Sequence, residues 1–224
     1  MTDHDLPTAD SVLAVCAHPD DESFGLGALL SEFVDTGAQV TVLCFTRGEA
    51  STLHGTPGHL GDVRAAELAA AATVLGVTRT ELLDYPDGHL SHQPLHELAA
   101  HVRRVADAMS ADMLLVFDEG GITGHPDHRR ATQAALAAAE GTTRAVLAWT
   151  VTEPVATALN DEFGTNFVDR EHTDIDITTP IDRTRQRAAM TQHASQLLET
   201  RVPVRRLALT GDTEYLRYLH RSER

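Results

Sequence analysis

An apolar run that changes abruptly into a polar cluster stands near the start of the chain, where residues 12–22 have the sequence VLAVCAHPDDE. The part at 12–17 is continuous and rich in branched residues, as expected of a strand covered on both faces. A second run of this kind, QVTVLCFT, occupies residues 39–46. Between them, residues 23–36 carry apolar side chains at helical spacing and stop before Gly37. These segments predict a β-α-β unit.

The same alternation continues through the rest of the chain. The sequence predicts a helix at 62–75, a strand at 81–85, a helix near 94–109, a strand at 112–117, a helix near 127–140 and a strand at 144–149. The C-terminal part is less regular, with a predicted strand at 173–177, a long helix at 180–199 and a short helix around 212–220. Alternating elements imply an α/β fold with a mostly parallel, doubly wound sheet. We expect a single domain over 1–224, with its core at 11–150 and the less regular part at 151–224.

Composition narrows the range of partners. The 224 residues include 33 acidic and 18 basic side chains, a formal charge of −15, which argues against a nucleic acid or an anionic membrane as main partner. No stretch approaches the roughly 18 apolar residues of a membrane span, and the polar N-terminus predicts no signal peptide. Cys16 and Cys44 lie inside apolar runs and are expected to be buried and reduced, which fits a cytoplasmic protein. The sequence does not decide between a monomer and a homo-oligomer.

Two His-Pro-Asp clusters follow predicted strands. The first is at 18–22, HPDDE, and the second lies in GHPDHR at 124–129, beyond the strand at 112–117. Because ligands of α/β sheets bind beyond the carboxyl ends of the strands, both clusters are expected at one edge of the sheet. Zinc in hydrolases commonly has three protein ligands and an open position for water. His18, Asp21 and His128 satisfy that count, and two histidines with one carboxylate also suit Fe(II).

The remaining polar residues of the clusters have chemistry of their own. Pro19 stiffens the first turn, so that Asp20 is expected to stand outside the coordination sphere, where a carboxylate beside the water acts as a general base. An imidazolium at His125 would stabilise an oxyanion or protonate a leaving amine. Asp20 and Glu22 could instead cap the helix that begins near Ser23. For Glu22 we favour capping, with support of a metal ligand as a second role.

The sequence also contains partial matches to a dinucleotide-binding motif and to a serine triad. A dinucleotide fingerprint around Gly25-Leu26-Gly27 fails because its third glycine position is Leu30 and carboxylates stand where a pyrophosphate would bind. His193 and Ser195 do not make a serine triad, because the nucleophile elbow GxSxG is absent. That late segment is interpreted as scaffold near the edge of the site. The long segment at 47–61 is a candidate substrate loop.

The two clusters, with further motifs, resemble the LmbE or PIG-L family of zinc-dependent N-acetylglucosamine deacetylases, which includes the mycothiol- and bacillithiol-pathway deacetylases. The supporting motifs are TRGE at 46–49, Arg64-x-x-Glu67 before LGV, DYPDG at 84–88 and HASQ at 193–196. The resemblance implies a Rossmann-like fold and the removal of an acetyl group from an amino sugar, a small-molecule substrate. It also fits a bacterial source, as does a basic complement made only of arginine.

The resemblance assigns roles residue by residue. It makes His18, Asp21 and His128 the Zn²⁺ ligands, Asp20 the general base and His125 the electrophilic partner, and it makes Arg64, Asp87 and Glu49 substrate-binding residues that grip sugar hydroxyls. Local alternatives remain for the last three: Arg64 could belong to an exposed helical pair, and Asp87 and Glu49 could be simple turn residues. Some family members carry a Tyr where this chain has Thr123, so His125 and the metal would supply more of the oxyanion stabilisation here.

Three functional hypotheses are open on the sequence. The first is a metal-dependent hydrolase that removes an N-acetyl group from an N-acetylglucosamine-type conjugate. The second is a hydrolase of another amide, as in antibiotic tailoring. The third is a noncatalytic module that binds a sugar or a metal. Asp20 favours an enzyme, because metal binding alone does not require a free carboxylate beside the ligands.

Overall fold

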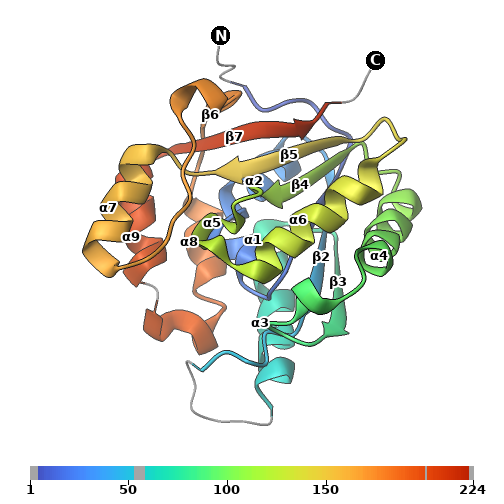
Figure 1. Ribbon diagram of the computed structural model, residues 1–224, viewed down its shortest axis with the longest axis horizontal. Coiled ribbons are helices and arrows are strands. Elements are labelled where there is room, and N and C mark those ends of the chain that lie inside the picture. The colour runs from blue at the N-terminus through green and yellow to red at the C-terminus, as the bar shows by residue number, and fades with distance from the viewer. Residues whose placement is uncertain (1–4, 53–58, 200, 222–224) are drawn as a thin grey trace.

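The computed structural model describes residues 5–52, 59–199 and 201–221, and within these ranges its centre is a seven-stranded sheet in the order β3-β2-β1-β4-β5-β7-β6 (Figure 1). The strands are β1 Ser11–Cys16, β2 Gln39–Thr46, β3 Arg79–Tyr85, β4 Met113–Phe117, β5 Ala145–Thr150, β6 Ile177–Pro180 and β7 Thr213–His220. The first five pair in parallel, whereas β7 runs antiparallel to both β5 and β6. The predicted α/β class with a mostly parallel, doubly wound sheet is confirmed.

Helices cover both faces of this sheet (Figure 1). They are α1 Asp21–Phe24, α2 Gly27–Asp35, α3 Leu60–Leu75, α4 Leu95–Ala108, α5 Gly121–Gly124, α6 Pro126–Ala139, α7 Glu153–Phe163, α8 Thr184–Met190 and α9 Arg201–Thr210, with 3₁₀ turns η1 Leu90–His92, η2 His172–Asp174 and η3 Ala194–Glu199. None of the helices in the described part of the chain has the length and apolar character needed to cross a membrane.

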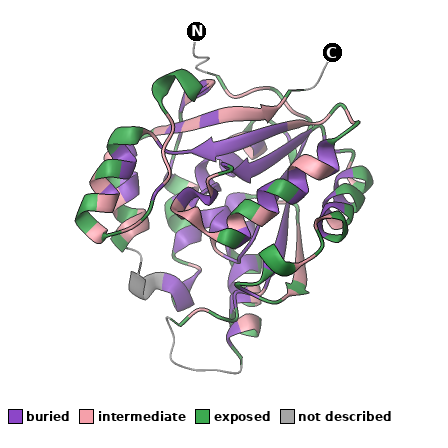
Figure 2. Ribbon diagram, in the orientation of Figure 1, coloured by how far each residue is buried: buried purple, intermediate pink, exposed green. Residues whose placement is uncertain are grey.

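Side chains of the central strands alternate between two apolar layers. Leu13 and Val15 of β1 pack with α4 and α6, while Val12 and Ala14 pack with α2, α3 and α8 on the other face. This alternation explains why the sequence of β1 is apolar without interruption: both faces of the strand are covered. Figure 2 shows the result, with buried central strands inside and exposed residues on the outer sides of the helices and in the loops.

The order of the strands reverses at β1, which has β2 on one side and β4 on the other. Crevices in open α/β sheets form at this switch point, beyond the carboxyl ends of the strands. The loop that carries His18 leaves β1, whereas His125 and His128 stand at the start of α6, which comes after β4 in the chain. The topology therefore brings the two His-Pro-Asp clusters together.

The helix predicted at 23–36 consists of two pieces, α1 and α2, separated at Gly25-Leu26. A Cβ atom on Gly25 would stand 2.4 Å from Cε1 of Phe117, the last residue of β4. Only glycine allows the chain to pass this ring so closely. The break thus lets the turn after β1 sit tightly against the end of β4, where the two clusters meet.

The C-terminal predictions were largely wrong. The segment predicted as a helix at 212–220 is strand β7, the strand predicted at 173–177 is mostly the turn η2 with β6 beginning at Ile177, and the helix at 180–199 is divided into α8 and η3. Helices α7 and α9 were not predicted. In β7, Glu214 and Leu216 are fully buried and lie two residues apart, which is the spacing of a strand. The charged and aromatic residues between and after them obscure this spacing in the sequence.

Candidate metal centre and active site

Three donor atoms converge between the ends of β1 and β4. His18 Nδ1 lies 3.2 Å from His128 Nε2, which lies 3.1 Å from Asp21 Oδ1. The donor atoms of the three residues all lie within 4.8 Å of one another. Ligands about 2.0–2.2 Å from a zinc ion at tetrahedral angles stand about 3.3–3.6 Å apart, close to the two short distances seen here. The structure therefore brings together the ligand set that the sequence predicted.

Each donor is oriented by a second contact. Asp21 Oδ2 accepts the backbone N–H groups of Ala17 (2.9 Å) and His18 (3.0 Å), which leaves Oδ1 facing His128. His128 Nδ1 donates to the carbonyl of Gly121 at 3.1 Å, which turns its Nε2 toward the cluster. Burial alone would raise the pKa of Asp21, but the charge of His128 and its hydrogen bond outweigh burial and hold the pKa well below its usual range. A carboxylate that is readily ionised and two imidazoles held in position suit a divalent metal.

The far side of the His18 ring meets two carboxylates. Its Nε2 lies 3.1 Å from Asp87 Oδ1 and 3.5 Å from Asp127 Oδ2. Burial lowers the pKa of His18, but the hydrogen bonds to Asp127 and Asp87 outweigh it and raise the pKa to about 10. Nε2 therefore keeps its proton and donates it, while Nδ1 faces the donor cluster. A metal bound there would displace the proton of Nδ1.

Asp127 also belongs to a second group that could hold a metal, with His18 and His125. Its carboxylate already accepts two backbone N–H groups, from Gly88 at 2.7 Å and Leu90 at 3.0 Å, and it is fully buried. These contacts join the loop after β3 to the start of α6 and fix Asp127 as a hydrogen-bond acceptor. We therefore favour the set with Asp21 as the metal centre.

Asp20 stands apart from the donors in an unusual backbone conformation. Its φ is 136°, a region that non-glycine residues rarely adopt. It precedes α1, but its side chain makes no capping hydrogen bond. Oδ2 instead accepts Nη2 of Arg64 at 2.9 Å, with 21% of the side chain exposed. Burial raises the pKa of Asp20 to about 6, although the charge of Arg64 opposes the shift.

Glu22 holds that strained backbone in place. Its Oε2 accepts the N–H of Asp20 at 2.9 Å, and its Oε1 accepts Nε2 of His193 at 2.6 Å and the hydroxyl of Ser23 at 2.7 Å. Glu22 and His193 are both fully buried. Burial lowers the pKa of His193, but the charge of Glu22 outweighs it and the net direction is upward. No local sequence pattern indicated this pairing, because the partners lie 171 residues apart.

The three predicted substrate-binding residues lie around the turn after β2. Arg64 is buried and donates through Nη1 to the carbonyl of Gly48 (2.8 Å) and through Nη2 to that of Pro19 (2.5 Å), so it is not an exposed helical residue. Asp87 accepts the N–H of Ala50 at 3.0 Å. Glu49 is exposed, and its carboxylate accepts the N–H of Asp87 at 2.9 Å.

His125 is the N-cap of α6, followed by Pro126 in the first turn. Its Nδ1 accepts the N–H of Asp127 at 3.2 Å, so the proton of the neutral ring lies on Nε2. Burial lowers the pKa of His125, and the neighbouring His128 and His18 lower it further. This favours a neutral ring that donates through Nε2–H rather than the imidazolium expected from the sequence. The ring centroid lies 4.9 Å from that of His18 and 4.8 Å from that of His128.

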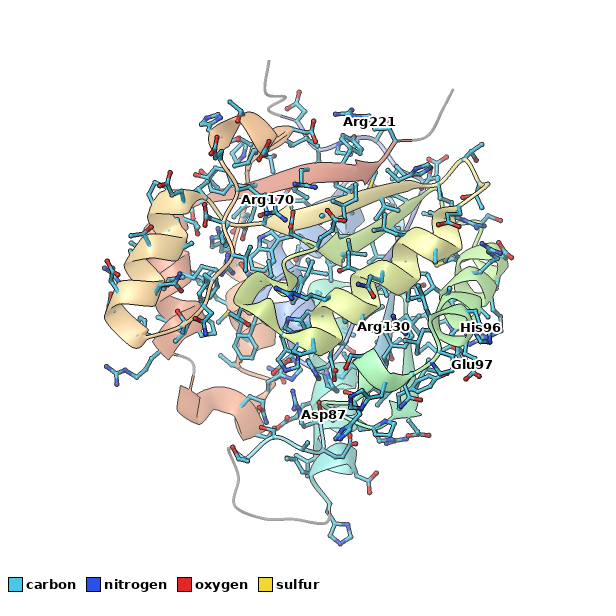
Figure 3. All side chains as sticks on the ribbon, in the orientation of Figure 1. Asp87, His96, Glu97, Arg130, Arg170 and Arg221 are labelled. Carbon is cyan, nitrogen blue, oxygen red and sulfur yellow. The ribbon has the colours of Figure 1, made fainter. Side chains whose placement is uncertain are left out.

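A cavity of about 570 Å³ opens over these groups. Its lining includes His18, Asp20, Asp21, Arg64, Asp87, Thr123, His125 and His128, so the donors, the Asp20 carboxylate and the capping histidine face one space. Figure 3 shows Asp87 beside the lower end of the sheet, far from Arg221 at the opposite edge. Residues 53–58 of the candidate substrate loop lie outside the described residues.

The family model of the GlcNAc-PI de-N-acetylases, PIG-L, matches residues 13–139, more than half of the chain. The chain belongs to the PIG-L family. A curated relative from Salinispora arenicola, a 1D-myo-inositol 2-acetamido-2-deoxy-alpha-D-glucopyranoside deacetylase, is 33% identical over 180 residues, which is 67% of this chain and 58% of the relative. The chain thus spans little more than half the length of that relative, and the family predicted from the motifs is confirmed.

Solved structures share the fold at lower identity. A deacetylase of the teicoplanin biosynthesis pathway has a TM-score of 0.73 at 20% identity, covering 93% of this chain and 96% of that one. GalB, a 4-carboxy-2-hydroxymuconate hydratase from Pseudomonas putida KT2440, has a TM-score of 0.72 at 18% identity, covering 96% and 98%. Because a protein named as a deacetylase and one named as a hydratase share this fold, the fold alone does not decide the reaction. Function has to be argued from the site.

Proposed function

We propose that this PIG-L family member is a metal-dependent hydrolase that removes an N-acetyl group from an N-acetylglucosamine-type conjugate. The observation that carries the proposal is the carboxylate of Asp20, which stands outside the donor cluster of His18, Asp21 and His128 but faces the same cavity. The name of the curated relative, a deacetylase of an acetamido sugar linked to inositol, supports the substrate class. Two nitrogens and one carboxylate oxygen suit Zn²⁺ best, with Fe²⁺ as the alternative.

Asp20 is suited to accept the proton of the attacking water. When bound, a divalent metal supplies a Lewis acid that polarises the amide carbonyl and lowers the pKa of water. With its own pKa near 6, Asp20 is ionised at neutral pH and is basic enough to take a proton in the transition state. Arg64 fixes the direction of this carboxylate through Oδ2, and Oδ1 is the oxygen we assign to proton transfer.

His125 is suited to stabilise the oxygen that becomes negative. Its Nε2–H is a hydrogen-bond donor fixed by the capping contact at Nδ1. Thr123 also lines the cavity but has a much shorter side chain than the Tyr of some relatives, so His125 and the metal carry most of this stabilisation. The protonated Asp20 then returns its proton to the amine that leaves.

We further propose that Arg64 and Asp87 meet the hydroxyl groups of the sugar from the side of β2 and β3. Both line the cavity while they hold Asp20 and His18. Glu49 would act through Asp87, whose N–H it accepts. In this arrangement, binding of the sugar and positioning of the catalytic groups depend on the same two side chains.

The test is acetate release by the whole chain, prepared metal-free and then reconstituted with Zn²⁺ or Fe²⁺. N-acetylglucosaminyl-inositol and simple N-acetylglucosamine glycosides are the substrates. We expect release that requires one metal ion per chain and stops when a chelator removes it. Stoichiometric metal without release from any amide would replace the proposal with a noncatalytic binding module.

A further inference from the structure

The lining of the cavity is divided into two walls of opposite character. The polar wall consists of Asp20, Ser51, Arg64, Asp87 and Gln196. The apolar wall consists of Phe24, Phe117, Ile122, Trp149, Phe167 and Val202. We propose that the apolar wall is a subsite for the acyl group of the substrate and that it takes a straight acyl chain longer than acetyl. This inference rests on the proposed function, because it concerns the amide cleaved at the same site.

The topology places the walls on opposite sides of the donor cluster. Ser51 and Asp87 follow β2 and β3, whereas Phe117 ends β4 and Trp149 lies near the end of β5. In the sheet order β3-β2-β1-β4-β5, the donors His18 and Asp21 follow β1, which has β2 and β3 on one side and β4 and β5 on the other (Figure 1). A group bound at the donors therefore has hydrogen-bonding side chains on one side and aromatic surface on the other.

The apolar wall begins at a metal ligand and continues away from it. The ring of Phe117 lies 4.9 Å from the ring of His128, and the ring of Trp149 lies 5.1 Å from that of Phe117. Beyond it, the guanidinium of Arg206 lies 4.7 Å over Trp149, with Nη1 directed to Glu214 (3.2 Å) and Nη2 to a backbone carbonyl (2.8 Å). Arg206 also lines the cavity, but these contacts engage its charged end with Glu214 and a backbone carbonyl.

An amide that reacts at the donors projects its two substituents in opposite directions. The amine side carries the sugar, whose hydroxyl groups need the hydrogen-bonding partners of the polar wall. The acyl side then points to the apolar wall, where acetyl would place one methyl group. Each additional buried methylene improves binding about fourfold. We therefore expect longer chains to raise kcat/KM, with hexanoyl at least tenfold above acetyl.

The test measures free amine released from glucosamine methyl glycosides that carry N-acetyl, N-butanoyl, N-hexanoyl or N-octanoyl groups, using the whole metal-loaded chain. Val202→Asp places a charge in the apolar wall, and we expect it to lower the ratio of hexanoyl to acetyl kcat/KM by at least tenfold. Val204→Asp is the matched control, because Val204 lies on the same helix, is 51% exposed and does not line the cavity. We expect it to leave the ratio unchanged.

The outcomes separate the two proposals. No amine from any member of the series would overturn the proposed function itself. Cleavage of the acetyl substrate, with slower cleavage of every longer chain and no effect of Val202→Asp on the ratio, would overturn the acyl subsite and leave the function standing. A further substrate is the octyl glycoside of N-acetylglucosamine. If its kcat/KM exceeded that of the methyl glycoside, and if Val202→Asp removed this gain, the wall would bind the group attached to the sugar. That result would likewise contradict the acyl subsite.

Discussion

The chain contains the tripeptide His-Pro-Asp twice, and the two copies have different structures and chemistry. In the first, His18 offers Nδ1 to the donor cluster and Asp20 faces the cavity with φ at 136°. In the second, His125 caps a helix and Asp127 is fully buried, with its oxygens on backbone N–H groups. Identical residues thus give a candidate metal ligand and a carboxylate that faces the cavity in one place, and a capping histidine and a buried acceptor in the other.

The difference arises from the helix that comes after each copy. The second copy begins α6, a helix of 14 residues, in which Pro126 is favourable in the first turn. The first copy precedes α1, which has only four residues, and Glu22 holds the backbone of Asp20 in the strained conformation. The conformation of the backbone, rather than the motif, therefore decides which carboxylate remains free for chemistry.

The largest effect is expected at His128, the donor that directly follows the second copy. His128→Ala removes one of the three ligands, so we expect loss of stoichiometric metal and no detectable amide hydrolysis. Metal content after dialysis and amine release measure these outcomes. His125→Ala is the control and should retain the metal while losing turnover. A His128→Ala variant with full metal content would contradict the ligand assignment.

The next effect concerns the free carboxylate of the first copy. Asp20→Asn keeps the size of the side chain but cannot accept the proton of the water, so we expect kcat to fall about 10²–10⁴-fold. Metal content and thermal stability should stay near those of the wild type. Turnover of the metal-loaded variant within a few-fold of the wild type would show that Asp20 is not the base.

A smaller effect is expected from the corresponding residue of the second copy. Asp127→Asn weakens the hydrogen bond that orients His18, and such contacts contribute about 10–100-fold to metal affinity. Competition with a chelator of known affinity measures this change, and circular dichroism confirms folding. At saturating metal, turnover should recover to near the wild-type value. An unchanged metal affinity would contradict the orienting role.

The smallest effect is a dependence on pH. Asp20 must be ionised to act as a base, so activity should fall as the pH drops through its pKa, about tenfold per unit below it. The value near 6 applies without a metal, and the charge of a bound ion lowers it, so the midpoint of the kcat/KM profile should lie at or below about 6. The wild-type profile is compared with that of the Glu22→Gln variant, which removes a charge beside Asp20 at the side chain that accepts the Asp20 N–H. A wild-type profile that stays flat to pH 4 would contradict the assignment.

Much of the central sheet could be predicted because its strands have uninterrupted apolar sequences. The convergence of His18, Asp21 and His128 followed from one rule, that parallel strands end at the same edge. The last strand could not be predicted in this way. Glu214 is buried in β7 only because Arg183 and Arg206 pair with it and the indole N–H of Trp149 donates to it, and these partners come from three other elements.

Contacts within the site show the same limit. The turn Pro86-Asp87-Gly88 is explained locally by its residues, yet Asp87 also binds the ring of His18. Likewise, Glu22 has the sequence pattern of a helix cap, but its partner His193 arrives from the far end of the chain. Short-range patterns thus identified the residue types of the site, while their pairings depended on tertiary structure.

The central claim is that one of the two motif aspartates is a base and the other orients a metal ligand. Measuring bound metal per chain and kcat at saturating metal, for Asp20→Asn and Asp127→Asn in parallel, tests it most directly. We predict that Asp20→Asn binds metal like the wild type without turning over, and that Asp127→Asn binds metal more weakly but turns over once saturated. If both variants lost the same property, or if the two results were exchanged, the claim would be contradicted.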